Sequence, residues 1–140
     1  MKLIQIIYPL FAMAALSFYI TIRLGRVRVR AVLQDGLKPA YFKYNRNAEP
    51  PEYMLRTEQH YTNLFEIPVL FYTVCLIAYV TSSVDLLSVL LAWSYVGTRC
   101  MHAYIHLRLN KLLKRRRIFI ISVFVLVTLW IELFVQLLIK

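Results

Sequence analysis

Polar and ionisable side chains lie inside apolar segments that are long enough to cross a membrane. A charge at the centre of a membrane helix costs roughly 2.5–3.5 kcal/mol on insertion scales, so such residues are usually paired and functional. We therefore expect chemistry at two rows of such residues. The first row is Arg56, Gln59, Asn63 and Glu66, followed by Pro68, and the second is Arg99, His102 and His106.

The spacing within each row places its members on one stripe of a helix. The first row has spacings of 3, 4 and 3 residues, and the second, which Tyr95 extends, has spacings of 4, 3 and 4. In antiparallel helices both rows lie toward the same membrane surface, where we expect Glu66 to neutralise Arg99. Pro68 lacks an amide donor and frees the carbonyl of Leu64, which predicts a kink beside the first row.

The basic members of these rows outnumber the acidic ones, which favours an anionic ligand. A purely structural network is the alternative, and its interhelical hydrogen bonds contribute only about 0.6 kcal/mol each on average. Asn63 and Glu66 fit such a network as well as they fit a site. The basic residues are harder to explain in that way, and they comprise Arg56, Arg99, His102, His106 and Arg115.

A metal site is a competing interpretation of the histidines. His102 and His106 are four residues apart, so their imidazoles face one side of a helix and suit a shared metal ion. Such a site needs further ligands, and only His60 and Glu66 remain available. The guanidinium of Arg99 beside His102 would repel a cation. We therefore predict an anion site and no metal site.

Four apolar blocks carry these rows. The chain has 140 residues, of which 60% are hydrophobic, whereas a soluble domain has about 45–50%. About 20 helical residues cross a bilayer core, and continuous apolar runs do not fit the alternating strands of a membrane barrel. We predict one all-α integral membrane domain, residues 1–140, folded as an up-down four-helix bundle. The transmembrane helices are expected at about 3–22, 56–80, 84–108 and 117–139, with a long loop at about 34–53.

The helices are expected to extend beyond these spans where charged residues follow them. The first continues through about Val32, the second begins near Glu52, and residues 110–114 form a short basic turn before the fourth.

The net charge of +10 indicates topology. Eight of the 17 Lys and Arg residues lie between Arg23 and Arg56 and six between Arg108 and Arg117, whereas residues 82–85 contain none. Positive charge marks cytoplasmic loops, so the first and third loops are predicted to be cytoplasmic and both termini to lie on the opposite side. Juxtamembrane charge accounts for almost all of the excess, so we expect membrane lipid and not nucleic acid as a partner.

Both rows, taken together with this topology, resemble the MAPEG family, the membrane-associated proteins in eicosanoid and glutathione metabolism. The four-helix length, the long first loop and the basic third loop extend the resemblance over essentially the whole chain. Arg56-x6-Asn63-x2-Glu66-x-Pro68 resembles the second-helix signature of that family, and Arg99-x2-His102-x3-His106 is similar to its third-helix pattern, Arg-x2-His/Tyr-x3-Tyr.

The resemblance implies a homotrimer that binds glutathione between subunits near the cytoplasmic face. Family members also place an arginine at the start of the fourth helix that activates the glutathione thiol; Arg115 is the first candidate, followed by Arg116 and Arg117. A guanidinium stabilises the thiolate, which is the nucleophilic form. The positions that match family glutathione contacts are Arg56, Asn63, Glu66, Arg99, His102 and His106.

Two of the candidate contacts differ in type from the family pattern. Gln59 stands where a second arginine often follows the first, and His106 stands where the third-helix tyrosine is expected. Two functions stay open. One is a glutathione-dependent transferase or peroxidase acting on lipophilic electrophiles, expected in a bacterial inner membrane. The other is a non-catalytic membrane protein that binds a lipid headgroup or another anion in the same basic pocket.

Overall fold

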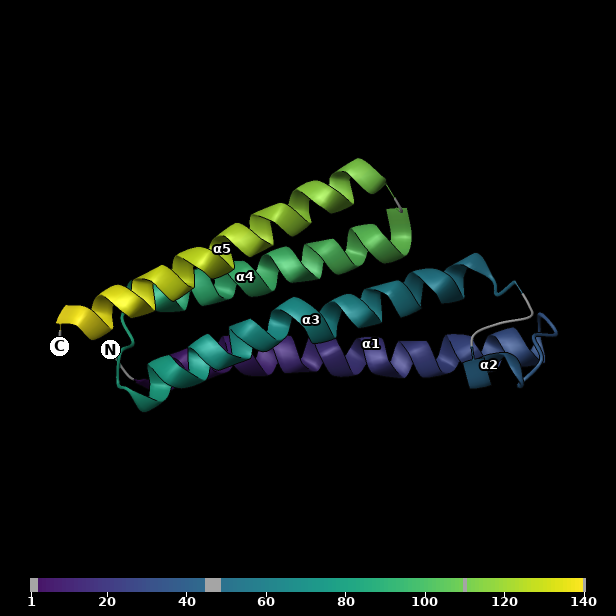
Figure 1. Cartoon of the computed structure of the whole chain (residues 1–140), viewed down its shortest axis with the longest axis horizontal. Helices are drawn as coiled ribbons and strands as arrows, with labels where there is room; N and C mark the ends of the chain where they lie inside the picture. Colours follow the sequence, from purple (N-terminus) through teal and green to yellow (C-terminus); the bar gives the residue numbers. More distant parts are fainter. Residues whose placement is uncertain (1–2, 45–48, 110, 140) are drawn as a thin grey trace.

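The computed structural model describes residues 3–44, 49–109 and 111–139, and these residues form helices and no strand. The predicted all-α class is therefore confirmed. The four long helices are α1 (Ile7–Leu33), α3 (Glu52–Val80), α4 (Leu86–Tyr104) and α5 (Leu112–Ile139) (Figure 1). Shorter elements are η1 (Leu3–Ile6), α2 (Tyr41–Tyr44) and η2 (Ile105–Leu109), which is a turn of π-helix that continues α4.

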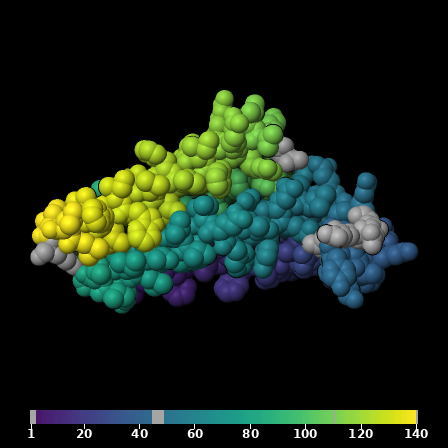
Figure 2. All heavy atoms as spheres, in the orientation of Figure 1, coloured from purple at the N-terminus to yellow at the C-terminus, as the bar shows by residue number. Residues whose placement is uncertain are grey.

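The long helices lie side by side as two pairs. α1 packs along α3, and α4 packs along α5 (Figure 1). An up-down bundle with short connections would place consecutive helices side by side, but α3 and α4 touch only briefly. Their short connection makes them antiparallel, but it does not bring their faces together. In the space-filling view the side chains of α5 rest on those of α3 instead (Figure 2).

The two ends of the molecule differ. Both termini and the α3–α4 connection lie at one end, and α2 and the α4–α5 connection lie at the other (Figure 1). The two helix pairs diverge toward the second end. We call this second end the basic end, because the arginine-rich segments of α1 and α5 lie there.

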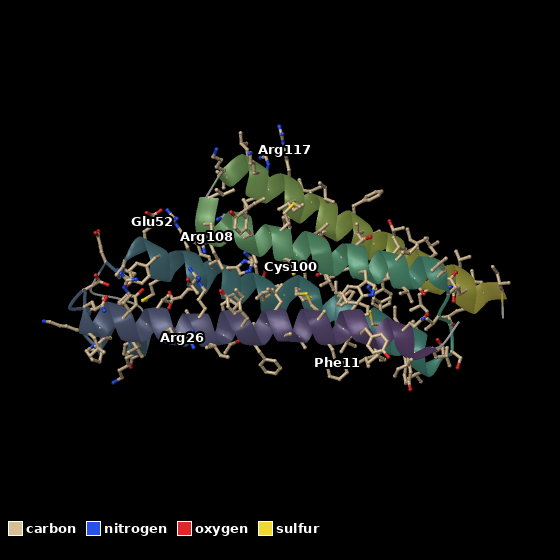
Figure 3. All side chains as sticks on the ribbon, turned by 180° about the vertical axis from the view of Figure 1, so that it is seen from behind. Phe11, Arg26, Glu52, Cys100, Arg108 and Arg117 are labelled. Atoms are coloured by element: carbon tan, nitrogen blue, oxygen red, sulfur yellow. The ribbon has the colours of Figure 1, made fainter. Side chains whose placement is uncertain are left out.

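Three stretches within the described residues are long and apolar enough to cross a membrane: Leu3–Leu33, Glu52–Val80 and Leu112–Ile139. α4 is long enough with 19 residues but is not among them, because Arg99 and His102 lower its mean hydropathy. Large apolar side chains point outward from the helices, as Phe11 does in Figure 3. Such an exterior suits lipid better than water.

The main core lies nearer the termini and is apolar. It joins all four long helices through residues such as Met13, Phe71, Val96 and Leu129. The rings of Phe71 and Tyr95 stack there with their centroids 4.5 Å apart. The polar rows therefore begin where this core ends, on the side of the basic end.

A smaller core closes the basic end of the α1–α3 pair. Ala31, Leu37, Tyr41 and Met54 are buried together, so the first loop folds back onto the helices that it connects. Arg28 of α1 also pairs with Glu58 of α3 at 2.8 Å. These contacts fix the position of α3 along the axis of α1, and they therefore also fix the position of the first polar row.

The fourth helix begins earlier than the sequence predicted. α5 starts at Leu112 and not at Arg117, so the basic run forms its first two turns. Leu, Lys and Arg are all good helix formers, and nothing in 112–117 stops a helix. Residue 110, the start of the predicted turn, lies outside the described residues.

Candidate functional site

The second polar row forms the buried face of α4 and η2. Tyr95, Arg99 and His106 are fully buried, and His102 is 2% exposed. η2 is a π-helical turn, in which each backbone hydrogen bond spans one residue more than in an α-helix. Such turns are found frequently at functional sites. The structure therefore turns this whole stripe inward, toward α3 and α5.

Arg99 is the largest fully buried side chain of the described residues. Its Nη2 donates to the backbone carbonyl of Asn63 at 2.9 Å. Its guanidinium carbon lies 5.9 Å from the ring centroids of both Tyr95 and Phe119. Nε and Nη1 of Arg99 find no partner among the described residues. A buried cation with free donors is costly unless an anion or water meets them.

The expected ion pair between Glu66 and Arg99 is wrong within the single chain. Glu66 is exposed, and Arg99 instead bonds to the backbone of Asn63, one turn earlier on α3. The reason is the arrangement of the helices. α3 and α4 touch only briefly, and at Arg99 it is the backbone carbonyl of Asn63 that meets the guanidinium, whereas Glu66 is exposed.

The first polar row lies largely toward the outside of the molecule. Gln59 and Glu66 are exposed, whereas Arg56 and Asn63 are half-buried. Arg56 pairs with Glu52, one turn earlier on the same helix. Among the described residues, Asn63 is the member of this row that forms a hydrogen bond with the second row.

His60 belongs to the buried cluster, although the sequence suggested it only as a possible metal ligand. Its ring centroid lies 5.4 Å from that of His102 and 5.2 Å from that of His106, which are themselves 5.8 Å apart. His60 was missed because it lies off the polar stripe, on the buried face of α3 with Thr57 and Leu64. The available signal was a single histidine on the apolar face of a membrane helix.

The three imidazoles are accompanied by arginines. Nη1 of Arg115 lies 3.1 Å from Nε2 of His106. A guanidinium only donates, so Nε2 of His106 accepts and the ring is neutral, with its proton on Nδ1. In the described part of the chain, no group of three or more His, Cys, Asp or Glu side chains is arranged to hold a metal ion.

A hollow of about 280 Å³ lies beside this cluster, where the two helix pairs diverge. Arg115 and Arg116 both line it, whereas Arg117 does not and points away from the molecule in Figure 3. No carboxylate of the described residues lines it, and Leu112 and Phe119 make one wall apolar. Its lining residues are Asn63, His102, Leu112, Arg115, Arg116 and Phe119.

The structure thus sorts the candidate residues into two groups. Asn63, His102 and Arg115 line the hollow, and hydrogen bonds join Arg99 to Asn63 and His106 to Arg115. Arg56, Gln59 and Glu66 lie outside it, on the outward-facing side of α3. Guanidinium and imidazole nitrogens gathered in this way have the chemistry of an anion site that opens toward the basic end.

Comparison with known proteins decides the family. A family model described as the MAPEG family matches residues 6–135. The chain belongs to the MAPEG family. The family resemblance of the two polar rows is therefore confirmed. The helices suited to crossing a membrane and this membership together make it an integral membrane protein. Searches of curated proteins and of solved structures gave no significant match.

Proposed function

We propose that this MAPEG protein is a glutathione-dependent transferase or peroxidase that acts on lipophilic electrophiles. One observation carries the proposal: Arg115 and His102 line a hollow beside a buried cluster in which Arg99, His102 and His106 keep nitrogens without partners among the described residues. Glutathione would enter this hollow from the basic end, which we expect to be cytoplasmic.

The free donors of the cluster fit the carboxylates of glutathione. Arg99 keeps Nε and Nη1, and His102 and His106 each keep Nδ1, without a partner among the described residues, and His102 also lines the hollow. A guanidinium binds a carboxylate through paired N–H groups, and such charged hydrogen bonds are about twice as strong as neutral ones. The absence of a carboxylate from the lining residues removes a source of repulsion.

Arg115 is the residue that we assign to the thiol of glutathione. Its side chain is half-buried, and its bond to His106 orients the guanidinium. Because a nearby guanidinium stabilises a thiolate, it lowers the pKa of the bound thiol and raises the fraction of the nucleophile. Bound glutathione would supply this sulfur, and Phe119 and Leu112 provide an apolar approach for the second substrate.

The outward face of α3 supports a homotrimer. Glu66 and Gln59 are exposed on a helix that is suited to crossing a membrane, where lipid contact with a carboxylate is costly. A second copy on this face would remove that cost and bring Arg56, Gln59 and Glu66 to a site between subunits. The hollow of one subunit is smaller than the 300–1,000 Å³ of typical ligand pockets, which fits an incomplete site.

The fourth membrane crossing is part of the same proposal. α4 runs between the ends of α3 and α5, both of which are suited to spanning a membrane. If α4 also spans, the protein is an up-down four-helix bundle with both termini on one side. The basic loops then lie in the cytoplasm of a bacterial inner membrane.

Conjugation of glutathione to a lipophilic aryl halide by purified protein tests the proposal. Arg115→Ala should lower the rate about a hundredfold, since removal of one group that stabilises a developing anion typically has an effect of this order. Lys111→Ala is the matched control, because Lys111 is exposed and does not line the hollow. A wild-type protein that binds glutathione but shows no such activity and no peroxidase activity would contradict the proposal.

A second function is favoured by the partners of two arginines. Arg56 is engaged by Glu52 and Arg115 by His106, so both guanidiniums are already held within the subunit. A non-catalytic protein that binds a lipid headgroup or another anion needs only the remaining donors. Calorimetry separates the two functions, because this alternative predicts anion binding that Arg115→Ala leaves nearly unchanged.

A further inference from the structure

A second basic hollow lies on α1. It has a volume of about 310 Å³ and shares no lining residue with the hollow at α5. In Figure 3 its Arg26 lies on the opposite side of the molecule from Arg117. Three guanidiniums and no carboxylate line it, and its lining residues are Tyr19, Ile22, Arg23, Arg26, Val27 and Arg30. We call it the α1 hollow.

Two of these arginines, Arg23 and Arg26, have neither an ion pair nor an aromatic ring contact within the described residues. Arg28, on another face of α1, is neutralised by Glu58, and Arg30 lies over the ring of Tyr53 at 5.1 Å. Arg23 and Arg26, by contrast, form no ion pair with any residue that the structure describes. Nε of Arg23 is also shielded from solvent without a hydrogen-bond partner. The α1 hollow therefore concentrates positive charge and contains a donor that only a ligand or water would satisfy.

The α1 hollow lies at the position along the membrane normal where lipid headgroups are expected. The charge-free run from Leu3 to Ile22 has the length of about 20 residues that crosses the hydrocarbon core. Arg23 is therefore the first residue at headgroup depth, and the segment to Arg30 rises about 10 Å further at 1.5 Å per residue. Tyr19 lies at the boundary, where tyrosines are enriched.

We propose that the α1 hollow binds the phosphodiester of an anionic membrane lipid. Arg23 and Arg26 donate paired N–H groups to the phosphate oxygens, a geometry that a guanidinium supplies and an ammonium does not. Tyr19 and Ile22 contact the glycerol and the first part of the acyl chains. This lipid is distinct from the ligand of the hollow at α5, so the proposal stands whether or not glutathione binds there.

Native mass spectrometry of the detergent-purified protein tests this proposal. The protein is incubated with equal amounts of dioleoylphosphatidylglycerol and dioleoylphosphatidylcholine, and the retained lipids are counted. We expect wild type to retain phosphatidylglycerol preferentially. In the double variant Arg23→Ala/Arg26→Ala the preference should fall about tenfold, because each arginine near an anionic headgroup contributes to binding.

Two control variants distinguish binding in the α1 hollow from nonspecific attraction between basic side chains and an anionic lipid. Lys111→Ala/Lys114→Ala removes the same charge from exposed positions outside both hollows and should leave the preference unchanged. Arg23→Lys/Arg26→Lys keeps the charge but should lose most of the preference, because lysine cannot bind a phosphate through a planar pair of donors. An equal loss in the two alanine double variants would overturn the proposal.

Competition distinguishes the source of the phosphate. We expect inorganic phosphate and glycerol phosphate at millimolar concentration to leave the bound phosphatidylglycerol in place. Displacement by either would overturn the assignment to a lipid and indicate a soluble phosphate ligand. A second copy of the chain on this face would show itself as a change of oligomeric mass in Arg23→Ala/Arg26→Ala with no change of lipid preference, and that result would also overturn the proposal.

Discussion

At the scale of single residues, Arg99 combines complete burial with unsatisfied donors. A buried charge without a carboxylate partner stabilises a fold little, and its replacement by an apolar side chain of similar volume is often neutral or stabilising by about 1–4 kcal/mol. We expect Arg99→Met to leave the melting temperature of the ligand-free protein unchanged or raised. It should also abolish the rise that glutathione produces in wild type, since stabilisation by a ligand follows its affinity. Thermal unfolding in detergent, with and without glutathione, measures the melting temperature of the ligand-free protein and the rise that glutathione produces. A lower melting temperature together with an intact glutathione response would show that Arg99 is structural.

Two histidines of the same cluster provide a matched pair. His102 lines the hollow, whereas His60 contacts His102 from behind and does not line it. A hydrogen bond to a charged ligand contributes about 1.5–3 kcal/mol, so His102→Leu should weaken glutathione binding about tenfold or more. His60→Leu should change the affinity less than threefold by the same reasoning. Calorimetric titration measures both affinities. Equal losses would mean that the cluster acts as one unit and that the hollow does not define the site.

The residues that the sequence could predict are those whose spacing defines a face by itself. Tyr95, Arg99, His102 and His106 repeat at helical intervals, and the structure buries all of them. The same rule could not tell whether Gln59 and Glu66 face the interior of the subunit or its surroundings, because periodicity gives a stripe and not its direction. It also could not connect His60 with the α4 row, since their contact depends on how α3 and α4 cross.

At the scale of elements, the small core at the basic end holds α1 and α3 in register. Met54 is fully buried in it, whereas Met101 on α4 is 55% exposed. Met54→Ala should therefore lower the free energy of unfolding by about 2–4 kcal/mol, and Met101→Ala should have a much smaller effect. Unfolding in mixed micelles measures both. If the two substitutions cost the same, the first loop does not pack on these helices as described.

Element boundaries and partners were harder to predict than the elements themselves. Long apolar runs predicted the helices. The start of α5 was not predicted because it lies in a basic run, which is polar but consists of residues with high helix propensity. The pairing of α1 with α3 and of α4 with α5 reflects the fit of whole helical faces, which short connections do not determine.

At the scale of the whole molecule, the proposed trimer makes a prediction about the outward face of α3. Leu70 continues the stripe of Gln59 and Glu66 and is 49% exposed, and Leu138 on α5 is 70% exposed. Leu70→Trp should dissociate the oligomer in detergent, because overpacking an interface typically costs about 1–3 kcal/mol per site. Leu138→Trp should leave it intact. Light scattering on size-exclusion fractions, referred to a chain of 16.6 kDa, measures the mass. A monomeric wild type, or a Leu70→Trp trimer, would contradict a trimer built on this face.

The most direct test of the whole account is the ionisation of glutathione bound to the protein. The ultraviolet absorbance of the thiolate is followed as pH is raised, with millimolar glutathione and purified protein in detergent. The account predicts that bound glutathione ionises at lower pH than free glutathione, that Arg115→Ala removes this difference, and that Lys111→Ala preserves it. No thiolate signal from wild type beyond that of free glutathione would contradict the account.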